Sequence, residues 1–190
     1  MRVIMLSPPG AGKGTQAKRL AQATGIMHIS SGDLLRAEIA AQSELGRRAV
    51  GFTERGDLVP DELIFEILLP AVIEAMRSSG GYLLDGFPRT VPQALRAAEL
   101  GVQFGLSSDA AVHLTAPEDV LIDRLIARAG RENRADDTLD VIKHRLTVFE
   151  QQTRPLVDYY RGRGILVEID ANRSEDEVQA ELRSRLIGDS

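Results

Sequence analysis

Short apolar runs alternate along the chain with longer stretches whose hydrophobic residues recur every three or four positions. Most of these runs are bounded by glycine, proline, serine or aspartate, which is typical of short strands buried inside a parallel sheet. The runs are "RVIML" at 2–6, "IMHIS" at 26–30, "GYLLD" at 81–85, "AAVHL" at 110–114 and "GILVEID" at 164–170. The pattern therefore predicts five strands.

The stretches between the runs predict helices, because their apolar residues recur at helical spacing. Pro70 is expected to kink or end the long helix that begins after Pro60, because proline lacks the N–H that a helix interior needs. Residues 130–137, "GRENRADD", are predicted to be a polar loop. The helices are expected at 13–23, 31–41, 44–55, after Pro60, and at 91–100, 116–129, 138–160 and 175–187. This alternation predicts an α/β fold with helices on both faces of a parallel sheet, and ligands bind such sheets at the carboxyl ends of the strands.

The composition is that of a soluble globular domain, since 43% of the 190 residues are hydrophobic and 27% are charged. The net charge of −5 argues against a general nucleic-acid binder, which would usually be basic. The absence of cysteine excludes disulfides and thiolate zinc sites. No run approaches the ~20 apolar residues of a membrane span. We therefore expect a cytoplasmic protein that acts as a monomer, with no nucleic-acid and no membrane partner.

One loop carries the clearest chemical signal. The stretch "MLSPPGAGKGTQ", from Met5 to Gln16, lies between a predicted strand and a predicted helix, and it nearly matches the phosphate-binding motif G-x-x-x-x-G-K-[ST]. Glycines let the backbone approach a ligand, and successive N–H groups at a helix N-terminus attract phosphates. The residues expected to bind a nucleoside triphosphate are Gly10, Ala11, Gly12, Lys13, Gly14 and Thr15. The alternative is a glycine-rich turn that binds nothing.

Two positions depart from the motif: Ser7 stands where the first glycine is usual, and Gly14 lies between the lysine and Thr15. Pro8 follows the serine, and a residue before proline is biased toward extended conformations with negative φ. In that conformation serine costs almost nothing, and its hydroxyl is expected to bond to a nearby loop amide. Ser7 is therefore expected to leave the loop working.

Six further motifs follow the phosphate loop in order: "ISSGDLLRAEI", "GDLVP", "LLDGFPRTVPQA", "NRADDT", "RL" at 145–146 and "YY" at 159–160. With this series the sequence resembles the adenylate kinase family over almost the whole chain. The resemblance implies a P-loop NTPase fold in three layers around a central parallel five-stranded sheet. It also implies one kinase domain over 1–190. That domain would have a core (1–29, 60–127 and 138–190), a small helical lobe for the nucleoside monophosphate (30–59) and a short lid (128–137).

The resemblance assigns an AMP site to the middle of the chain. The Gln93 amide offers a donor and an acceptor to one edge of a base. The family uses glutamine here for adenine, whereas related pyrimidine monophosphate kinases tend to have asparagine at positions 90 and 93. Arg36 and Arg89 are expected to grip phosphate, Arg89 through a bidentate pair. The residues expected to bind AMP are Ser31, Arg36, Asp57, Leu58, Val59, Gly86, Phe87, Pro88, Arg89, Gln93, Arg134 and Arg145.

Other charged residues are assigned to the triphosphate and to the transferred group. Asp85 ends a predicted strand, where its carboxylate is expected to hold Mg²⁺ through water, because Mg²⁺ sheds water reluctantly; the alternative is a loop cap. Arg124 and Arg128 share one helix face, and the alternative is a solvated face paired with acidic neighbours. By resemblance, Arg128 and the backbone near Arg173 contact ATP. The expected catalytic residues are Lys13, Arg89, Arg124, Arg128, Arg134 and Arg145.

The reaction implied by this set is Mg·ATP + AMP ⇌ 2 ADP, with Mg²⁺ as cofactor, ATP as co-substrate and small nucleotides as partners. Phosphoryl transfer is catalysed mostly by positioning and charge stabilisation, and an ionised phosphate acceptor needs no general base. His28, His113 and His144 are therefore expected to be structural. Two alternatives stay open: another nucleoside monophosphate kinase, of the UMP/CMP type, and an adenine-nucleotide sensor that binds without turnover.

Overall fold

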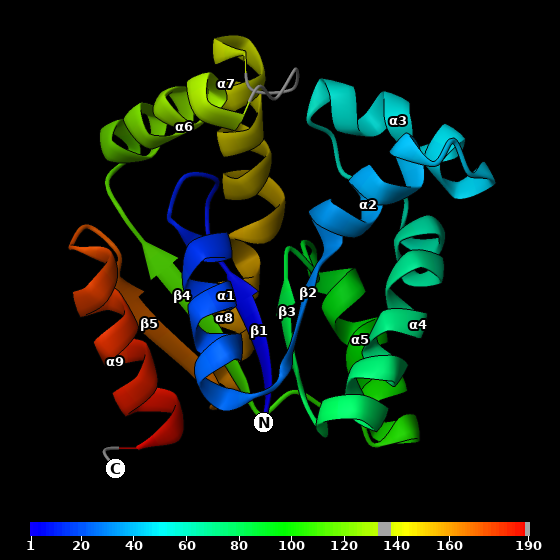
Figure 1. Ribbon diagram of the computed structural model, residues 1–190, viewed down its shortest axis with the longest axis vertical. Helices are drawn as coiled ribbons and strands as arrows, with labels where there is room; N and C mark the ends of the chain where they lie inside the picture. Colours follow the sequence, from blue (N-terminus) through cyan, green and yellow to red (C-terminus); the bar gives the residue numbers. More distant parts are fainter. Residues whose placement is uncertain (133–137, 189–190) are drawn as a thin grey trace.

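A computed structural model describes residues 1–132 and 138–188 of the chain, without the side chains of residues 128–132. Its centre is a five-stranded sheet in which all neighbouring strands are parallel (Figure 1). The strand order is β2-β3-β1-β4-β5. The strands are β1 (Arg2–Leu6), β2 (Met27–Ser30), β3 (Tyr82–Asp85), β4 (Ala110–Thr115) and β5 (Leu166–Asp170). The five predicted strands and the α/β class are confirmed.

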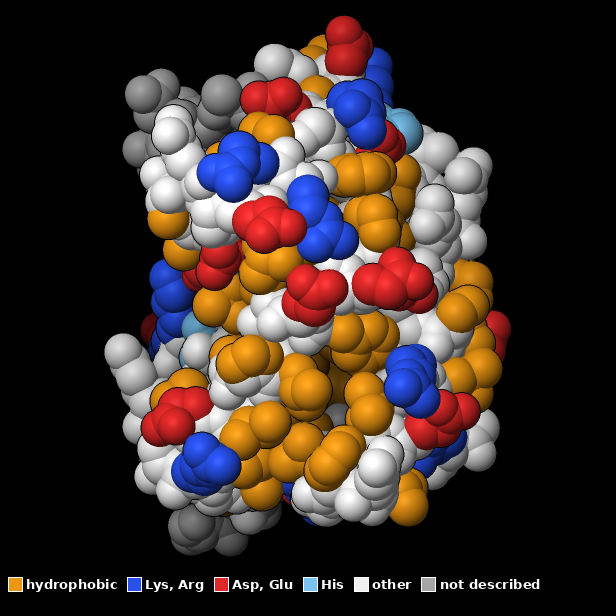
Figure 2. Space-filling model, turned by 90° about the vertical axis from the view of Figure 1, so that its right-hand side faces the viewer, with side chains coloured by type: hydrophobic (Ala, Val, Ile, Leu, Met, Phe, Trp, Pro, Cys, Tyr) orange, Lys and Arg blue, Asp and Glu red, His pale blue; other side chains and the backbone are white. Residues whose placement is uncertain are grey.

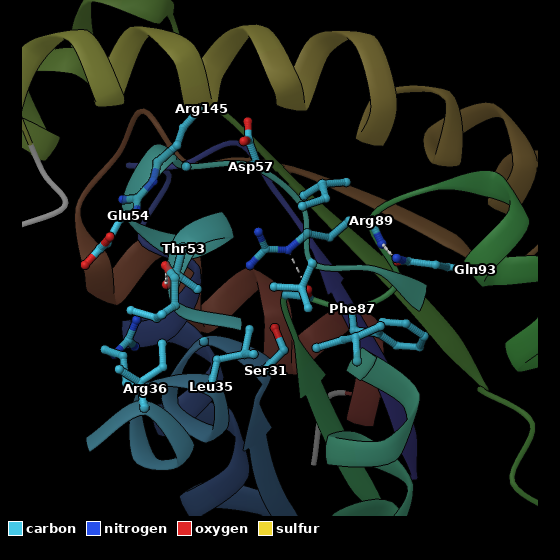
Figure 3. A pocket seen from close by; sticks show the side chains of 18 residues that line it. Ser31, Leu35, Arg36, Thr53, Glu54, Asp57, Phe87, Arg89, Gln93 and Arg145 are labelled. Carbon is cyan, nitrogen blue, oxygen red and sulfur yellow. Dashed lines mark hydrogen bonds between the residues drawn. The ribbon is translucent and has the colours of Figure 1, made fainter. Parts of the chain in front are cut away.

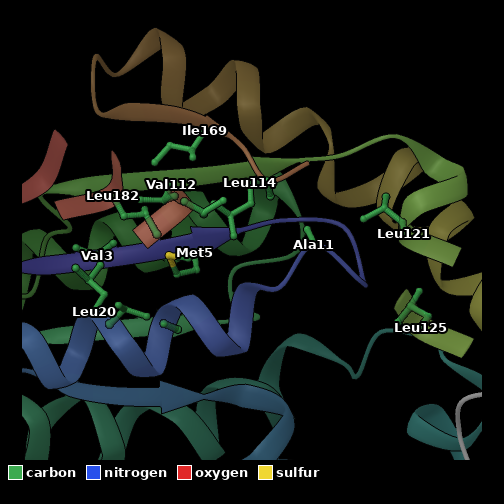
Figure 4. Packing of buried hydrophobic residues seen from close by; sticks show 14 of the residues in the cluster. Val3, Met5, Ala11, Leu20, Val112, Leu114, Leu121, Leu125, Ile169 and Leu182 are labelled. Atoms are coloured by element: carbon green, nitrogen blue, oxygen red, sulfur yellow. The ribbon is translucent and has the colours of Figure 1, made fainter. Parts of the chain in front are cut away.

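Helices cover both faces of the sheet because the strands alternate their side chains between the two sides. In β1, Val3 and Met5 belong to one buried cluster, whereas Ile4 and Leu6 belong to another. The first cluster packs against α1 (Lys13–Thr24) and α9 (Glu175–Ile187), and Figure 4 shows Leu20 and Leu182 from these helices beside the strands. The second packs against α5 (Val91–Phe104) and α8 (Pro155–Gly162). The expected three layers are therefore present.

A small helical unit stands beside the carboxyl end of the sheet. It consists of α2 (Ser31–Ala40) and α3 (Glu44–Arg55), and its buried Leu35 and Ala49 share a cluster with α4 (Asp61–Ser79). The two short helices touch at Gly46, where an added Cβ would lie 2.1 Å from the carbonyl oxygen of Glu38. Only glycine allows that approach. Ser30 begins α2 as an N-cap, because its hydroxyl accepts a hydrogen bond from the Asp33 amide.

The structure corrects three helix boundaries. Pro70 does not end α4, which continues to Ser79; Pro70 is exposed, so the carbonyl that its ring leaves unpaired can reach water. Residues 130–132, predicted as loop, extend α6 (Glu118–Glu132). The helix predicted over residues 91–100 is longer in the structure, where α5 continues to Phe104. Gly105 then ends it as a C-cap in the left-handed conformation.

The long helix predicted over 138–160 is three segments. These are α7 (Leu139–Val148), a π-helical turn η1 (Phe149–Thr153) and α8. Pro155 cannot donate an i→i−4 bond and crowds the preceding turn. The chain adapts by widening that turn: the Arg154 amide donates to the Phe149 carbonyl five residues back, at 2.8 Å.

Hydrophobic side chains also remain on the surface. Figure 2 shows the side of the molecule on which α4 and α5 lie, and hydrophobic side chains gather in its lower half. Ile73, Leu95, Val102 and Phe104 are the exposed large hydrophobic residues of these two helices. Among the described residues, no helix combines the length and the apolar content that a membrane crossing requires.

Ser7 follows β1 and is buried, with a negative φ as predicted from Pro8. The sequence predicted that its hydroxyl bonds to a loop amide, and this prediction is wrong. Instead it accepts a hydrogen bond from the Leu114 amide of β4 at 3.3 Å and donates to the Leu6 carbonyl. The side chain therefore ties the end of β1 to the neighbouring strand.

Ser7→Gly should change stability more than activity. The variant loses a buried side-chain bond and gains unfolded-state freedom, so it should unfold more easily by about 1–2 kcal/mol in urea titrations. The kcat/KM for ATP should change by less than about threefold, because the phosphate loop proper begins at Gly10. A glycine variant more than about tenfold faster would mean that Ser7 distorts the loop.

Candidate active site

The phosphate loop joins the end of β1 to the start of α1 and presents its backbone to an open space. Gly10 and Gly12 have φ of 88° and 80°, which L side chains rarely adopt. A Cβ at Gly10 would lie 2.6 Å from the carbonyl oxygen of Leu121, so this position also needs glycine for space. Gly12 is the N-cap of α1 and offers no side-chain cap. The first N–H groups of α1 are therefore available to an anion.

Asp85 lies at the carboxyl end of β3, next to β1 in the sheet. Its Oδ1 forms an ion pair with Nζ of Lys13, and its Oδ2 lies 3.6 Å from Nε2 of His28. Burial acts to raise the pKa of Asp85, but the Lys13 ammonium and His28 outweigh it and hold that pKa well below its ordinary value. The carboxylate therefore stays ionised at neutral pH.

A cavity of about 680 Å³ opens above the phosphate loop, and cationic side chains surround it. Arg124 is held there by a 3.1 Å hydrogen bond from its Nη1 to the carbonyl of Ala171. Arg173 donates to the carbonyl of Asp170 at 3.0 Å and forms an ion pair with Glu181. The sequence-predicted residues that line this cavity are Gly10, Ala11, Gly12, Lys13, Gly14, Thr15, Ser31, Arg36, Leu58, Asp85, Gly86, Pro88, Arg89, Arg124, Arg145 and Arg173.

A second cavity, of about 280 Å³, lies between the α2–α3 unit and the start of α5 (Figure 3). Gly86 lies in its wall with φ of 83°, and a Cβ there would be 2.5 Å from Oγ of Ser31. That hydroxyl is buried and has no hydrogen-bond partner among the described residues. The sequence-predicted residues that line this cavity are Ser31, Arg36, Asp57, Leu58, Val59, Gly86, Phe87, Arg89, Gln93 and Arg145.

Two predicted residues cannot be placed. The side chain of Arg128, although its backbone belongs to α6, and the whole of Arg134 lie outside the described residues. Pro88 was predicted to contact the monophosphate, but it lines the larger cavity and not the smaller one.

Arg89 lies where the two cavities meet, as do Arg36 and Arg145. Its Nε donates to the Gly86 carbonyl at 2.7 Å. Burial lowers the pKa of Arg89; Asp85 acts to raise it, and Arg145 and Arg36 push it lower. A guanidinium with so high an ordinary pKa stays cationic, so this position offers a fixed, poorly hydrated positive charge to a ligand in either cavity.

Sequence comparisons agree with this geometry. A family model described as adenylate kinase matches residues 5–165. The chain belongs to the adenylate kinase family. An adenylate kinase of Stenotrophomonas maltophilia is 43% identical over 188 residues, which cover 99% of this chain and 100% of the relative. Adenylate kinases of Kocuria rhizophila and Parasynechococcus marenigrum are 44% and 47% identical; the first match covers 97% of this chain and 98% of the relative, and the second covers 93% of each.

Membership of the adenylate kinase family confirms the resemblance that the seven ordered motifs indicated. The residues matched by the family model include those that line both cavities, except for the segment after β5. Arg173 is in that segment and so lies beyond the match to the family model. The position of Arg173 in the larger cavity therefore comes from the structure.

Some residues at this site carried no recognisable sequence signal. Thr153, in the π-helical turn, donates from Oγ1 to the Arg89 carbonyl at 2.8 Å. Thr53 and Glu54, near the end of α3, line the smaller cavity. His144 was predicted to be structural, and its Nε2 lies 2.8 Å from Oδ1 of Asp57. The contacts of Thr153 and His144 join segments far apart in sequence, so no local pattern could indicate them.

Proposed function

We propose that this chain, an enzyme of the adenylate kinase family, transfers a phosphoryl group from ATP to AMP and gives two ADP, in the reversible reaction Mg·ATP + AMP ⇌ 2 ADP. The observation that carries the proposal is the pair of adjoining cavities with Arg36, Arg89 and Arg145 in the wall of both. A reaction between two bound nucleotides needs such a shared, positively charged boundary, because the phosphates must meet there.

The larger cavity is proposed to bind ATP. The glycine loop supplies backbone N–H groups, Lys13 supplies an ammonium at the start of α1, and Arg124 and Arg173 also line the cavity. Phosphates bind well at a helix N-terminus. Arg128 and the adenine contact near Arg173 remain predictions from the family resemblance.

The smaller cavity is proposed to bind AMP. Its apolar wall contains Leu35, Ile64 and Phe87, which suits a planar base, and Arg36 and Arg89 suit the phosphate. Gln93 and the Ser31 hydroxyl, for which the described part of the chain holds no partner, add polar groups to the wall. Arg134 and Arg145 are proposed to contact the same phosphate.

The catalytic contribution of the protein is positioning and charge. In a loose transition state the negative charge spreads over the transferred group. Lys13, Arg124 and Arg145 come from three different helices and Arg89 from the loop between β3 and α5, and all four line the larger cavity. Arg128 and Arg134 are proposed to join them. No proton has to be removed from the attacking phosphate oxygen, so the histidines have no general-base role.

Mg²⁺ fits the residues that line this cavity. Mg²⁺ is usually bound by one or two carboxylates, several waters and substrate phosphates, and Asp85 offers one ionised carboxylate beside the phosphate loop. Asp85 is proposed to hold the ion through water, and the hydroxyl residue Thr15, in the first turn of α1, lines the same cavity. When bound, the ion would neutralise charge on the triphosphate.

The proposed domain arrangement is a core with two smaller parts. Residues 30–59 would form the monophosphate-binding lobe and residues 128–137 a short lid, and both would close to exclude water as a competing acceptor. We further propose that the protein acts as a cytoplasmic monomer in nucleotide balance, with no nucleic-acid or membrane partner.

A coupled assay tests the proposed reaction directly. ATP is offered with AMP, GMP, UMP or CMP, and ADP formation is followed with and without Mg²⁺. We expect AMP to have the highest kcat/KM and the reaction to need the metal. A preference for UMP or CMP would favour a pyrimidine monophosphate kinase, and binding without turnover would favour a sensor.

A bisubstrate ligand should bind far more tightly than either nucleotide. Two adenosines joined by five phosphates would fill both cavities in one event, and linkage of two binding sites raises the affinity by about 100-fold or more. Calorimetry measures the affinity, and hydrogen exchange should show protection over residues 30–59 and 128–137. Protection confined to the phosphate loop would argue for a one-site binding protein.

A further inference from the structure

Two protein groups hold the Gln93 side-chain amide from opposite sides. The backbone N–H of Arg89 donates to Oε1 of Gln93 at 2.8 Å, and Nε2 of Gln93 donates to Oδ1 of Asp61 at 2.8 Å. Gln93 is 3% exposed and lies in the wall of the smaller cavity (Figure 3). The Gln93 amide is therefore buried at both contacts, whereas Asp61 reaches it from an exposed position.

These contacts allow only one orientation of the amide. A backbone N–H can only donate, so it must face the oxygen of Gln93, and an ionised carboxylate can only accept, so it must face the NH₂ group. If the amide rotated by half a turn, two donors would oppose each other at Arg89 and two acceptors at Asp61. A buried polar group without a partner is strongly disfavoured.

The fixed amide still has capacity for a ligand. The oxygen has a second lone pair and the NH₂ group a second hydrogen. On the corresponding edges of the purines, adenine carries an acceptor at N1 beside a donor at N6, whereas guanine carries a donor at N1 beside an acceptor at O6. An amide that cannot rotate matches only one of these two orders, whereas an amide that can rotate matches either.

We propose that Asp61 determines the selectivity for adenine over guanine in the monophosphate site by fixing the orientation of the Gln93 amide. This inference rests on the proposed function of the smaller cavity. Asp61 lines neither cavity, so it acts through Gln93 and is a positioning residue. It reaches Gln93 from the first turn of α4, 32 residues earlier in the chain.

Arg89 connects the contacts that fix the Gln93 amide to the shared boundary of the cavities. Its N–H holds the Gln93 oxygen, its carbonyl accepts from Thr153, and its guanidinium lies between the two proposed nucleotide sites. Recognition of the base and placement of the phosphate-binding cation therefore depend on the same short backbone segment. The contact between Asp61 and Gln93 can be altered by substitution of Asp61 without changing that backbone segment.

The test is the ratio of kcat/KM for AMP to that for GMP, measured with ATP at saturation. Asp61→Asn keeps the shape but offers either an acceptor or a donor, so only the Arg89 N–H still opposes rotation of the Gln93 amide. We expect the ratio to fall about tenfold, which is the effect of one well-formed hydrogen bond. The change should appear in the KM for each monophosphate, and the KM for ATP should stay within about twofold.

Glu62→Gln is the matched control, because Glu62 also lies in the first turn of α4 and loses the same charge. Its AMP-to-GMP ratio should equal that of the parent. Asp61→Glu keeps an acceptor and should retain more of the selectivity than Asp61→Asn. If Asp61→Asn fails to fold, Asp61→Ser removes the fixed acceptor with a residue that suits a helix start, and the same fall is expected.

The outcomes separate this inference from the proposed function. A parent that prefers AMP, with an unchanged ratio in Asp61→Asn, would overturn the inference alone, because Asp61 would then only support the fold. An equal fall in Glu62→Gln would overturn it as well, since the cause would be the charge near the helix. A parent that prefers UMP or CMP would overturn the proposed acceptor and the inference with it.

Discussion

Lys13→Met is expected to lower kcat by about 100-fold or more while the protein stays folded. The ammonium is proposed to act on the terminal phosphates, and the loss of one preorganised charge in a phosphoryl-transfer site is of this order. The variant also removes the ion-pair partner of Asp85, whose side chain is only 8% exposed. We therefore expect a loss of about 1–3 kcal/mol in the free energy of unfolding. Steady-state kinetics and urea titration measure the two effects.

A second substitution separates the rate from the stability. In the double variant Lys13→Met with Asp85→Asn, the unpaired carboxylate is gone, so stability should recover in part while kcat stays low. Lys143→Met is the surface control, because Lys143 lies on α7 and lines neither cavity. A Lys13→Met variant that keeps at least a tenth of the parent turnover would rule out the proposed role of the loop.

Arg89→Lys should lower kcat about 100-fold although the charge is retained. Arg89 presents its guanidinium to both cavities and uses Nε to hold the Gly86 carbonyl. Lysine has no planar fork, so it cannot bond to that carbonyl and to a phosphate in the same geometry. The KM for AMP should rise at the same time, because the residue lies in the wall of the proposed AMP site. Initial rates over a range of AMP and ATP concentrations give both constants.

The control for this change is Arg96→Lys. Arg96 is exposed on α5, pairs with Glu99 and lines neither cavity. It should leave kcat within about twofold, since exposed ion pairs contribute little. An Arg89→Lys variant with unchanged kcat and KM would mean that the charge alone matters at the boundary between the cavities, and that the fork geometry does not.

Local sequence patterns predicted much of this molecule. The apolar runs identified all five strands, because a strand buried on both faces needs a continuous run of hydrophobic residues. The glycine loop was identified because it lies between a strand and a helix, a context that neighbouring residues reveal. The backbone conformations at Gly10 and Gly12 are likewise a local property. The negative φ of Ser7 followed from Pro8 for the same reason.

Some features depended on packing that a local pattern does not contain. Proline rules predicted a kink or an end at Pro70; α4 does not end there, and it buries Leu63 and Ala75 on either side of the proline. At Pro155 the outcome was a π-helical turn, which places Thr153 against the Arg89 carbonyl. The choice between these responses depends on what each turn contacts in the folded protein.

The sequence by itself determined the five strands and most of the helices, which loop can approach phosphate and which arginines are available. Only the tertiary structure decided that Arg36, Arg89 and Arg145 form a common wall between two cavities, and that Asp61 and the Arg89 amide hold Gln93 in one orientation. The reason is physical. Hydrophobic period, glycine conformation and proline restriction act over a few residues, whereas the direction of a buried amide is set by donors and acceptors that the fold brings together from distant segments.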